Sequence, residues 1–178
     1  MGNPRVSDAG FDSNALQKLV PKTLKGRWYR TVKKKYRTKV ENPEGSARVD
    51  GRYHTTDVDM VIYLSDSPTL SMNESSKAFH TVPLKESAWY TATFTVELKR
   101  VLDLTDPEVL SRLGITPADL VQPKPVGYRL PQEIAEQARA IGFEAILAPT
   151  ARPGMSGKNL VVFLEIVADS GGTAALAK

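Results

Sequence analysis

The chain contains no cysteine, and its two histidines are His54 and His80. The lack of cysteine excludes disulfide bonds, thiolate catalysis and the usual structural zinc sites, and it is typical of a cytoplasmic protein. Because a histidine-rich site needs more ligands than these two, we predict no bound metal. No apolar run approaches the roughly 20 residues of a membrane-spanning helix. Residues 1–13 also lack the apolar segment of a secretory signal, so we expect a cytoplasmic protein without a membrane partner.

Three motifs of nucleotide-binding and hydrolytic enzymes are also absent. The sequence has neither the GxGxxG dinucleotide fingerprint nor the GxSxG nucleophile elbow. The segment 154–159 (GMSGKN) resembles a phosphate-binding loop only faintly. Arg152 occupies the position of its first glycine, and Asn159 occupies the position of the required serine or threonine. His54 lies in a loop, where a lone histidine is usually exposed, and we assign it no role.

The bulk composition is that of a soluble globular protein. The 178 residues are 41% hydrophobic and 25% charged, which predicts one domain with a sizeable core. The net charge is +4, and much of the excess lies within residues 22–39, around Lys33–Lys35 and Arg37. This stretch is either a solvated basic edge or a rim that attracts a nucleotide or an acidic partner. No recognised nucleic-acid motif accompanies the charge.

Apolar periodicity and capping residues predict a mixture of strands and helices. Strands are expected at 28–32, 58–64, 89–98, 144–148 and 160–167. Helices are expected from the start signal at 65–68 to about Phe79, from Thr105 to about Gly114, and over 131–141.

This order of elements predicts an α+β fold, a single compact domain with a mixed, mainly antiparallel sheet. Residues 1–25 are expected to form an N-terminal arm, and residues 26–168 the catalytic domain. Residues 169–178 are small and polar, and they are expected to form a flexible C-terminal tail.

Three evenly spaced residues form the candidate site. Arg52 follows a turn, Tyr63 lies eleven residues later on a hydrophobic strand, and Glu74 lies eleven residues after that on a helix. In one cleft, the guanidinium would bind phosphates, the tyrosine would position a ligand, and the carboxylate would stabilise a developing cation. That set of groups suits a dinucleotide. The alternative is a glutamate that shares its helix face with Leu70 and Ala78 and pairs with an arginine for packing alone.

Several short segments, each weak as a motif by itself, follow one another in a characteristic order. They are Trp28-Tyr29-Arg30, Gly51-Arg52-Tyr53, Tyr63-Leu64-Ser65, Glu74, Val101-Leu102-Asp103-Leu104, 132–141, Gly142-Phe143-Glu144-Ala145-Ile146, Pro149-Thr150-Ala151 and 157–163. In this order and spacing they resemble the RES-domain family, the toxin components of RES–Xre type toxin–antitoxin systems. The resemblance covers residues 28–163, which is most of the chain.

The resemblance implies an activity, a fold and a partner. It implies an NAD-degrading toxin of a type II system, which cleaves the nicotinamide–ribose bond by hydrolysis or phosphorolysis on an ADP-ribosyltransferase-like fold. NAD is then the substrate, phosphate is a candidate co-substrate, and no cofactor is implied. The implied partner is an Xre-type helix-turn-helix antitoxin that covers the active site and provides any contact with nucleic acid.

The same resemblance assigns the site residues. The catalytic set is Glu74, Arg52, Tyr63 and Arg30, and the substrate-binding set is Arg30, Arg52, Tyr53, Tyr63, Thr150, Ser156 and Asn159. The family serine usually follows a proline, and this chain has Thr150 after Pro149. Threonine keeps the hydroxyl and is favoured, while Ser156 is the alternative if its loop folds back.

Two other function classes stay open at the level of sequence. Transfer of ADP-ribose to a macromolecular target would use the same cleft with a different acceptor. A non-catalytic basic binding module would bind nucleic acid in a salt-dependent way and turn over no substrate.

Overall fold

The computed structural model describes residues 10–45, 48–56, 60–75, 88–124 and 126–177. The strands are β1 (Lys22–Lys33), β2 (Val61–Ser65), β3 (Trp89–Asp103), β4 (Ala145–Pro149), β5 (Lys158–Phe163) and β6 (Thr173–Leu176). The α-helices are α1 (Ser13–Gln17), α2 (Pro68–Ser75), α3 (Pro107–Leu113), α4 (Pro117–Val121), α5 (Arg129–Ile141) and α6 (Leu164–Ser170). Short 3-10 helices are η1 (Lys34–Lys39), η2 (Pro43–Gly45) and η5 (Val126–Tyr128). Val58, Ala78, His80 and the predicted end of α2 at Phe79 lie outside the described residues.

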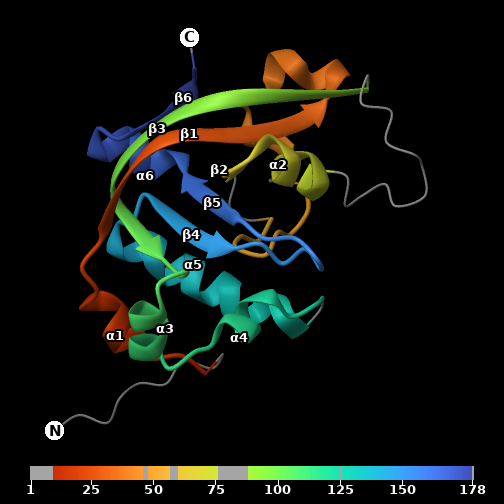
Figure 1. Ribbon diagram of the computed structural model, residues 1–178. Helices are drawn as coiled ribbons and strands as arrows, with labels where there is room; N and C mark the ends of the chain where they lie inside the picture. Colours follow the sequence, from red (N-terminus) through yellow and green to blue (C-terminus); the bar gives the residue numbers. More distant parts are fainter. Residues whose placement is uncertain (1–9, 46–47, 57–59, 76–87, 125, 178) are drawn as a thin grey trace, which may run out of the picture.

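The strands form one sheet in the order β1-β2-β5-β4-β3-β6, and β1 also pairs with β3. This extra pairing closes the sheet into a small barrel, with the long strand β3 curving across β1 (Figure 1). The β3–β4 pair is parallel, and the other pairs are antiparallel. The predicted α+β class with a mixed, mainly antiparallel sheet is therefore confirmed.

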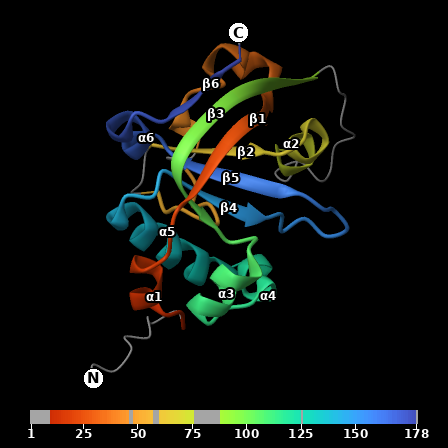
Figure 2. The same cartoon turned by 60° about the vertical axis from the view of Figure 1, so that its left-hand side comes forward.

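Alternation along the strands divides the core into two clusters. Ile62 and Leu64 of β2 pack inside the barrel, whereas Val61 and Tyr63 pack on the opposite side against the helices. Successive residues of a strand point to opposite faces, which accounts for this division of β2. Figure 2 shows α1, α3, α4 and α5 gathered on one side of the strands, where they cover the cluster that contains Val61 and Tyr63.

Within the described residues, the pairing between β1 and β2 is short. β1 pairs with β3 from Lys22 to Lys33, but within the described residues it meets β2 only at Tyr29 and Ser65. The two strands therefore separate beyond Tyr29. Helix α2 begins three residues after Ser65, with the Ser67 hydroxyl accepting from the Leu70 N–H at 3.2 Å.

The region after β5 differs from the prediction. The expected strand over 160–167 ends at Phe163, and residues 164–170 form α6. The apolar run continues through this boundary, and such a run does not distinguish a strand from a buried helix. The expected tail contains β6, which pairs with β3 from Thr173 to Leu176. β1 likewise begins at Lys22, inside the expected N-terminal arm.

A fully buried carboxylate joins three of these elements. Glu144 precedes β4, and its side chain accepts from the backbone N–H groups of Lys99 at 2.5 Å and Arg100 at 2.7 Å. It also accepts from the Ser170 hydroxyl at the end of α6. Buried backbone donors need partners, so Glu144 satisfies β3 at the point where β3 turns from β1 toward β4.

We expect Glu144→Ala to lower the free energy of unfolding by about 3 kcal/mol, because it leaves two backbone N–H groups and the Ser170 hydroxyl without their acceptor and opens a gap at a fully buried position. Urea denaturation of the two proteins measures this difference. The matched control is Glu136→Ala, since Glu136 is exposed on α5 and should change stability little. Equal effects of the two substitutions would contradict the structural role of Glu144.

Candidate active site

A cavity of about 330 Å³, called the cleft below, opens in the barrel wall where β1 and β2 separate. Its walls come from the end of β1, residues 51–53, β2, α2 and the connection between β4 and β5. Six of the predicted site residues line the cleft, namely Arg30, Arg52, Tyr53, Tyr63, Glu74 and Asn159. The structure thus brings together residues that are spread over most of the chain.

Glu74 lies in the last turn of α2, and its carboxylate is held on both oxygens. Oε1 accepts from the Thr150 hydroxyl at 2.8 Å and from the Asn159 side-chain amide at 2.9 Å. Oε2 lies 3.6 Å from Nε of Arg152. All three partners come from β5 and the β4–β5 connection, so the position of the carboxylate depends on how α2 packs against them.

The surrounding hydrogen bonds set the direction of each proton in this network. The Thr150 hydroxyl accepts from the backbone N–H of Arg152 at 3.1 Å, which directs its own proton toward Glu74. The Asn159 amide oxygen accepts from the Ser65 hydroxyl at 2.9 Å, which leaves the amide N–H₂ for Glu74. An ionised carboxylate, which only accepts hydrogen bonds, is the form that this network fits.

Arg152 is a site residue to which the sequence assigned no role. Its side chain is 11% exposed, and its guanidinium donates to the Asn73 carbonyl and lies 3.5 Å from the Glu74 carbonyl. These carbonyls end α2, where they have no partner within the helix. Arg152 therefore caps α2 and pairs with the Glu74 carboxylate at once. The signal in the sequence is an arginine two residues after Thr150, which is too common a pattern to identify it.

The Arg52 side chain lines the cleft and is also hydrogen-bonded to a neighbouring segment of the chain. One guanidinium nitrogen donates to the carbonyls of Leu120 at 2.9 Å, Gln122 at 2.8 Å and Gly127 at 3.3 Å. The guanidinium carbon also lies 4.7 Å from the centre of the Tyr128 ring. Arg52 thus holds the segment between α4 and η5 beside the cleft, and the rest of its fork is available for an anion.

The Tyr63 hydroxyl is oriented by its neighbours. It lies 2.8 Å from Nδ1 of His54 and accepts from the backbone N–H of Tyr53 at 3.1 Å. Nε2 of His54 lies 3.1 Å from the Val49 carbonyl, which can only accept, so in the neutral ring Nδ1 accepts from Tyr63. Burial raises the pKa of Tyr63 far above its ordinary value, so the phenol is neutral. His54 is buried rather than exposed, contrary to the sequence-based expectation.

The turn that carries Arg52 requires glycine at position 51. The Gln132 side chain of α5 donates to the carbonyls of Gly51 at 2.9 Å and His54 at 3.2 Å, which fixes the turn on the helix. A Cβ atom on Gly51 would lie 2.2 Å from the His54 ring and 2.7 Å from the Tyr63 hydroxyl. Only glycine allows this close approach.

Arg30 and Tyr53 occupy different depths of the cleft. Arg30 donates to the Val40 carbonyl at 2.9 Å, and burial lowers the pKa of its guanidinium to about 10, so it remains cationic at neutral pH. Tyr53 is 3% exposed and belongs to the core under the helices. Within the described residues its hydroxyl has no hydrogen-bond partner, and burial raises its pKa.

The two candidate hydroxyls for the family serine lie in different surroundings. Thr150 donates to Glu74 directly, as described above. Neither residue is among those that line the cleft, but Ser156 is also exposed, whereas Thr150 is half-buried. The geometry therefore favours Thr150 as the hydroxyl of the site.

The part of the chain that the structure describes contains no cluster of three or more histidine, aspartate or glutamate side chains suited to a metal ion. In the same residues, no helix combines the length and the apolar character needed to cross a bilayer.

Comparison with known proteins assigns the family. A family model described as the RES domain matches residues 27–170. The chain belongs to the RES domain family. The crystal structure of the M.tuberculosis MbcT–MbcA toxin–antitoxin complex contains a similar chain, with a TM-score of 0.72 and 21% sequence identity over 93% of this chain and 88% of that one. This likeness shows that the two chains share a fold. No curated protein matches the chain.

We expect Gly51→Ala to lower the free energy of unfolding by about 1–3 kcal/mol, because its Cβ displaces the His54 ring. The cost should fall when the same change is made in a His54→Ala background, since the clashing ring is then gone. Denaturation of the four proteins in this double-mutant cycle measures the coupling. An equal cost in both backgrounds would show that the close approach of Gly51 to His54 does not matter.

Proposed function

We propose that this chain is the NAD-degrading toxin of a toxin–antitoxin pair and cleaves the bond between nicotinamide and ribose. The observation that carries the proposal is the carboxylate of Glu74. It lines a cleft that also contains Arg30 and Arg52, and it is fixed there by Thr150 and Asn159. A fixed negative charge beside two guanidinium groups suits a substrate with a phosphate at one end and a developing cation at the other.

The chemistry needs little beyond this charge. When the ribose–nicotinamide bond breaks, its electron pair moves to the ring nitrogen, and positive charge develops on the ribose as in glycoside cleavage. Nicotinamide leaves as a neutral molecule, so no strong acid is required. Glu74 stabilises the positive ribose more than it stabilises the intact substrate, which lowers the barrier. Water or phosphate then bonds to the ribose carbon and gives ADP-ribose or its 1-phosphate ester.

The two arginines would bind the pyrophosphate. Arg30 donates to the Val40 carbonyl, and its remaining N–H groups have no acceptor among the described residues. Arg52 keeps part of its fork after bonding to the α4–η5 segment. Planar guanidinium groups bind phosphate through paired N–H bonds that lysine does not reproduce. Tyr63 would contact the nicotinamide-ribose end, since it lines the same cleft as Glu74.

The toxin assignment and the partner rest on the family. The chain belongs to the RES domain family, and the similar solved structure is a toxin–antitoxin complex. This likeness supports an antitoxin partner. We propose that it is an Xre-type helix-turn-helix protein, as the family resemblance implies, and that it covers the cleft and blocks NAD from it. Contact with nucleic acid would then be made by the antitoxin.

We expect Glu74→Gln to slow nicotinamide release by about 10²–10³-fold, comparable to the loss of one preorganised group at a reacting charge. Glutamine keeps the shape and the acceptor oxygen but removes the negative charge. The purified protein is incubated with NAD, with and without phosphate, and nicotinamide is measured by chromatography. Glu136→Gln on the exposed face of α5 is the matched control and should retain the full rate.

The products separate the remaining possibilities in the same experiment. ADP-ribose without phosphate indicates hydrolysis, and a phosphorylated product that requires phosphate indicates phosphorolysis. Transfer of label from NAD to a macromolecule would show that the activity is ADP-ribosyl transfer and not simple cleavage of NAD. An unchanged rate in Glu74→Gln would overturn the role of Glu74, and no turnover of NAD in any buffer would overturn the proposed activity.

We also expect Arg152 to act as a positioning residue. Arg152→Gln should lower kcat by about 10–100-fold with little change in KM, because Glu74 loses its cation and α2 loses its cap while the phosphate-binding groups stay in place. Arg152→Lys should recover part of kcat, since an ammonium can pair with the carboxylate but cannot also reach both carbonyls. Arg129→Gln, at an exposed position, is the control. A rise in KM alone would contradict this role.

A further inference from the structure

A second cavity of about 310 Å³ adjoins the cleft. It lies between the end of β1, η1 and the segment around η2 and Arg48, and it shares Arg30 and Val32 with the cleft. Figure 1 shows η1, drawn in orange, directly beyond the end of β1. The cleft alone is near the lower end of the usual range for ligand sites, about 300–1,000 Å³. A ligand larger than the cleft can therefore extend past Arg30 into the second cavity.

The group at the junction of the two cavities is a cation. Arg30 is half-buried, stays protonated at neutral pH, and uses one of its five N–H groups on the Val40 carbonyl. Burial of a charge is unfavourable unless an opposite charge or hydrogen-bond acceptors lie nearby. An anion placed over Arg30, at the point where the two cavities meet, would supply both.

The second cavity is itself positively charged. Arg48 and Lys39 line it together with Arg30, and Glu44 is its acidic residue. Glu44 pairs with Lys39 at 3.6 Å, whereas Arg48 has no carboxylate partner within the described residues. Arg30 and Arg48 therefore carry uncompensated charge in the lining of the cavity.

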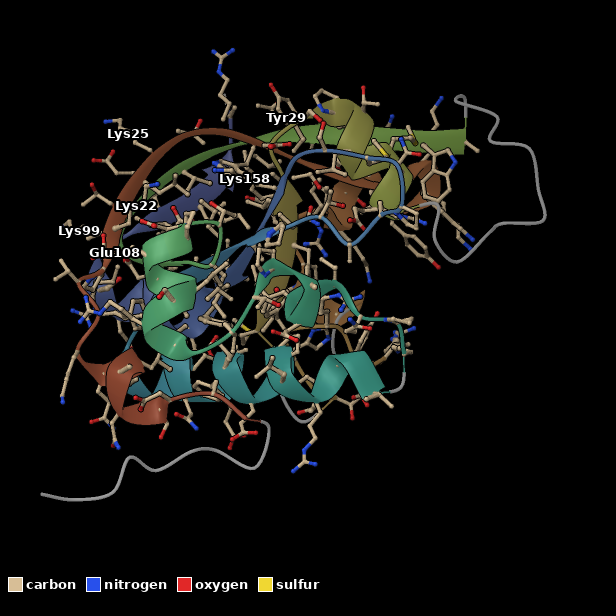
Figure 3. All side chains as sticks on the ribbon, turned by 60° about the horizontal axis from the view of Figure 1, so that its bottom comes forward. Lys22, Lys25, Tyr29, Lys99, Glu108 and Lys158 are labelled. Atoms are coloured by element: carbon tan, nitrogen blue, oxygen red, sulfur yellow. The ribbon has the colours of Figure 1, made fainter. Side chains whose placement is uncertain are left out.

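Two other basic residues of β1, Lys22 and Lys25, lie elsewhere. Lys22 pairs with Asp103 at 2.7 Å, and Lys25 pairs with Glu97 at 3.1 Å. Figure 3 shows both lysines with Lys99 at the end of the barrel away from α2. Since the 12 residues of β1 span roughly 40 Å, these charges do not contribute to the second cavity. The basic stretch of the sequence is therefore two separate regions, and only the later one adjoins the cleft.

The remaining lining groups suit a nucleoside. The Tyr36 ring is 48% exposed and forms part of the cavity wall, so one of its surfaces is available to a base. Aromatic side chains stack on bases without regard to sequence. The Asn42 oxygen accepts from the Glu44 N–H at 2.8 Å, which leaves the Asn42 N–H₂ group for a ligand acceptor.

We propose that the second cavity binds the adenosine end of the dinucleotide substrate, with the pyrophosphate over Arg30 and the nicotinamide ribose beside Glu74. This inference rests on the proposed function, because it takes NAD as the substrate. Two cavities joined at a cation match a ligand in which two nucleosides flank a central pyrophosphate. The end with the scissile bond must lie in the cleft, since Glu74 lines the cleft and not the second cavity.

ADP binding tests the second cavity without any need for catalysis. Calorimetry compares ADP binding to the intact protein and to Arg48→Gln, Tyr36→Leu and Arg37→Gln. We expect each of the first two variants to weaken ADP binding about tenfold, as for the loss of one charge-assisted or stacking contact. Arg37→Gln removes the same charge from η1 at a residue that does not line the cavity, and it should leave ADP binding unchanged.

Kinetics with a truncated substrate provides the second measurement. Nicotinamide mononucleotide contains the same scissile bond but lacks the adenylate. The preference for NAD over this substrate, as a ratio of kcat/KM, should fall about tenfold in Arg48→Gln and stay constant in Arg37→Gln. Melting curves of all variants confirm that they are folded.

Three outcomes would overturn the assignment of the second cavity. The first is that ADP does not bind the intact protein, and the second is that ADP binds all four proteins equally. Alternatively, inorganic phosphate alone shows the full dependence on Arg48 while Tyr36→Leu has no effect, which would identify a simple anion site. Failure of the proposed function looks different, because NAD would then give no Glu74-dependent nicotinamide while ADP binding still depended on Arg48 and Tyr36.

Discussion

The separation of β1 from β2 is the constraint on which the site depends. A closed barrel satisfies the backbone groups of its strands, but here the two strands meet at Tyr29 and Ser65 and then diverge. The exposed backbone of β1 needs other partners, and α2 supplies one, since the Ser75 hydroxyl donates to the Thr31 carbonyl at 2.6 Å. The helix that closes the opening is the same helix that carries Glu74. The opening in the sheet and the position of the carboxylate are therefore one structural feature.

The Glu74 network explains how a carboxylate can be both fixed and reactive. Thr150, Asn159 and Arg152 reach it from the β4–β5 side of the cleft, and each of them is oriented by a further contact. Charged groups arranged in advance stabilise a transition state because they need not reorganise when charge develops. Arg152 reduces the negative charge that the substrate experiences, but it holds the helix end and the carboxylate in place. The Glu74 carboxylate is therefore partly neutralised by Arg152, but its position is well defined.

Opposite charges are distributed along the cleft in the order that the proposed dinucleotide substrate requires. The negative group, Glu74, lies on the α2 side, and the cation Arg30 lies at the boundary with the second cavity. Lysines at the other end of β1 are paired with carboxylates and are removed from the site by the length of the strand. The positions of the basic residues that lack a carboxylate partner therefore say more about ligand binding than the net charge of +4 does.

The sequence by itself determined the local periodicity of β2 and β3, the start of α2 at its serine cap, and the even spacing of Arg52, Tyr63 and Glu74. These features depend on neighbours in the chain, so alternation and capping residues encode them. Only the tertiary structure decided that Arg152 pairs with Glu74, that His54 orients Tyr63, that residues 173–176 add a strand to β3, and that a second cavity meets the cleft at Arg30. Each of these is a contact between distant segments, and it follows from how the closed barrel packs rather than from any local pattern.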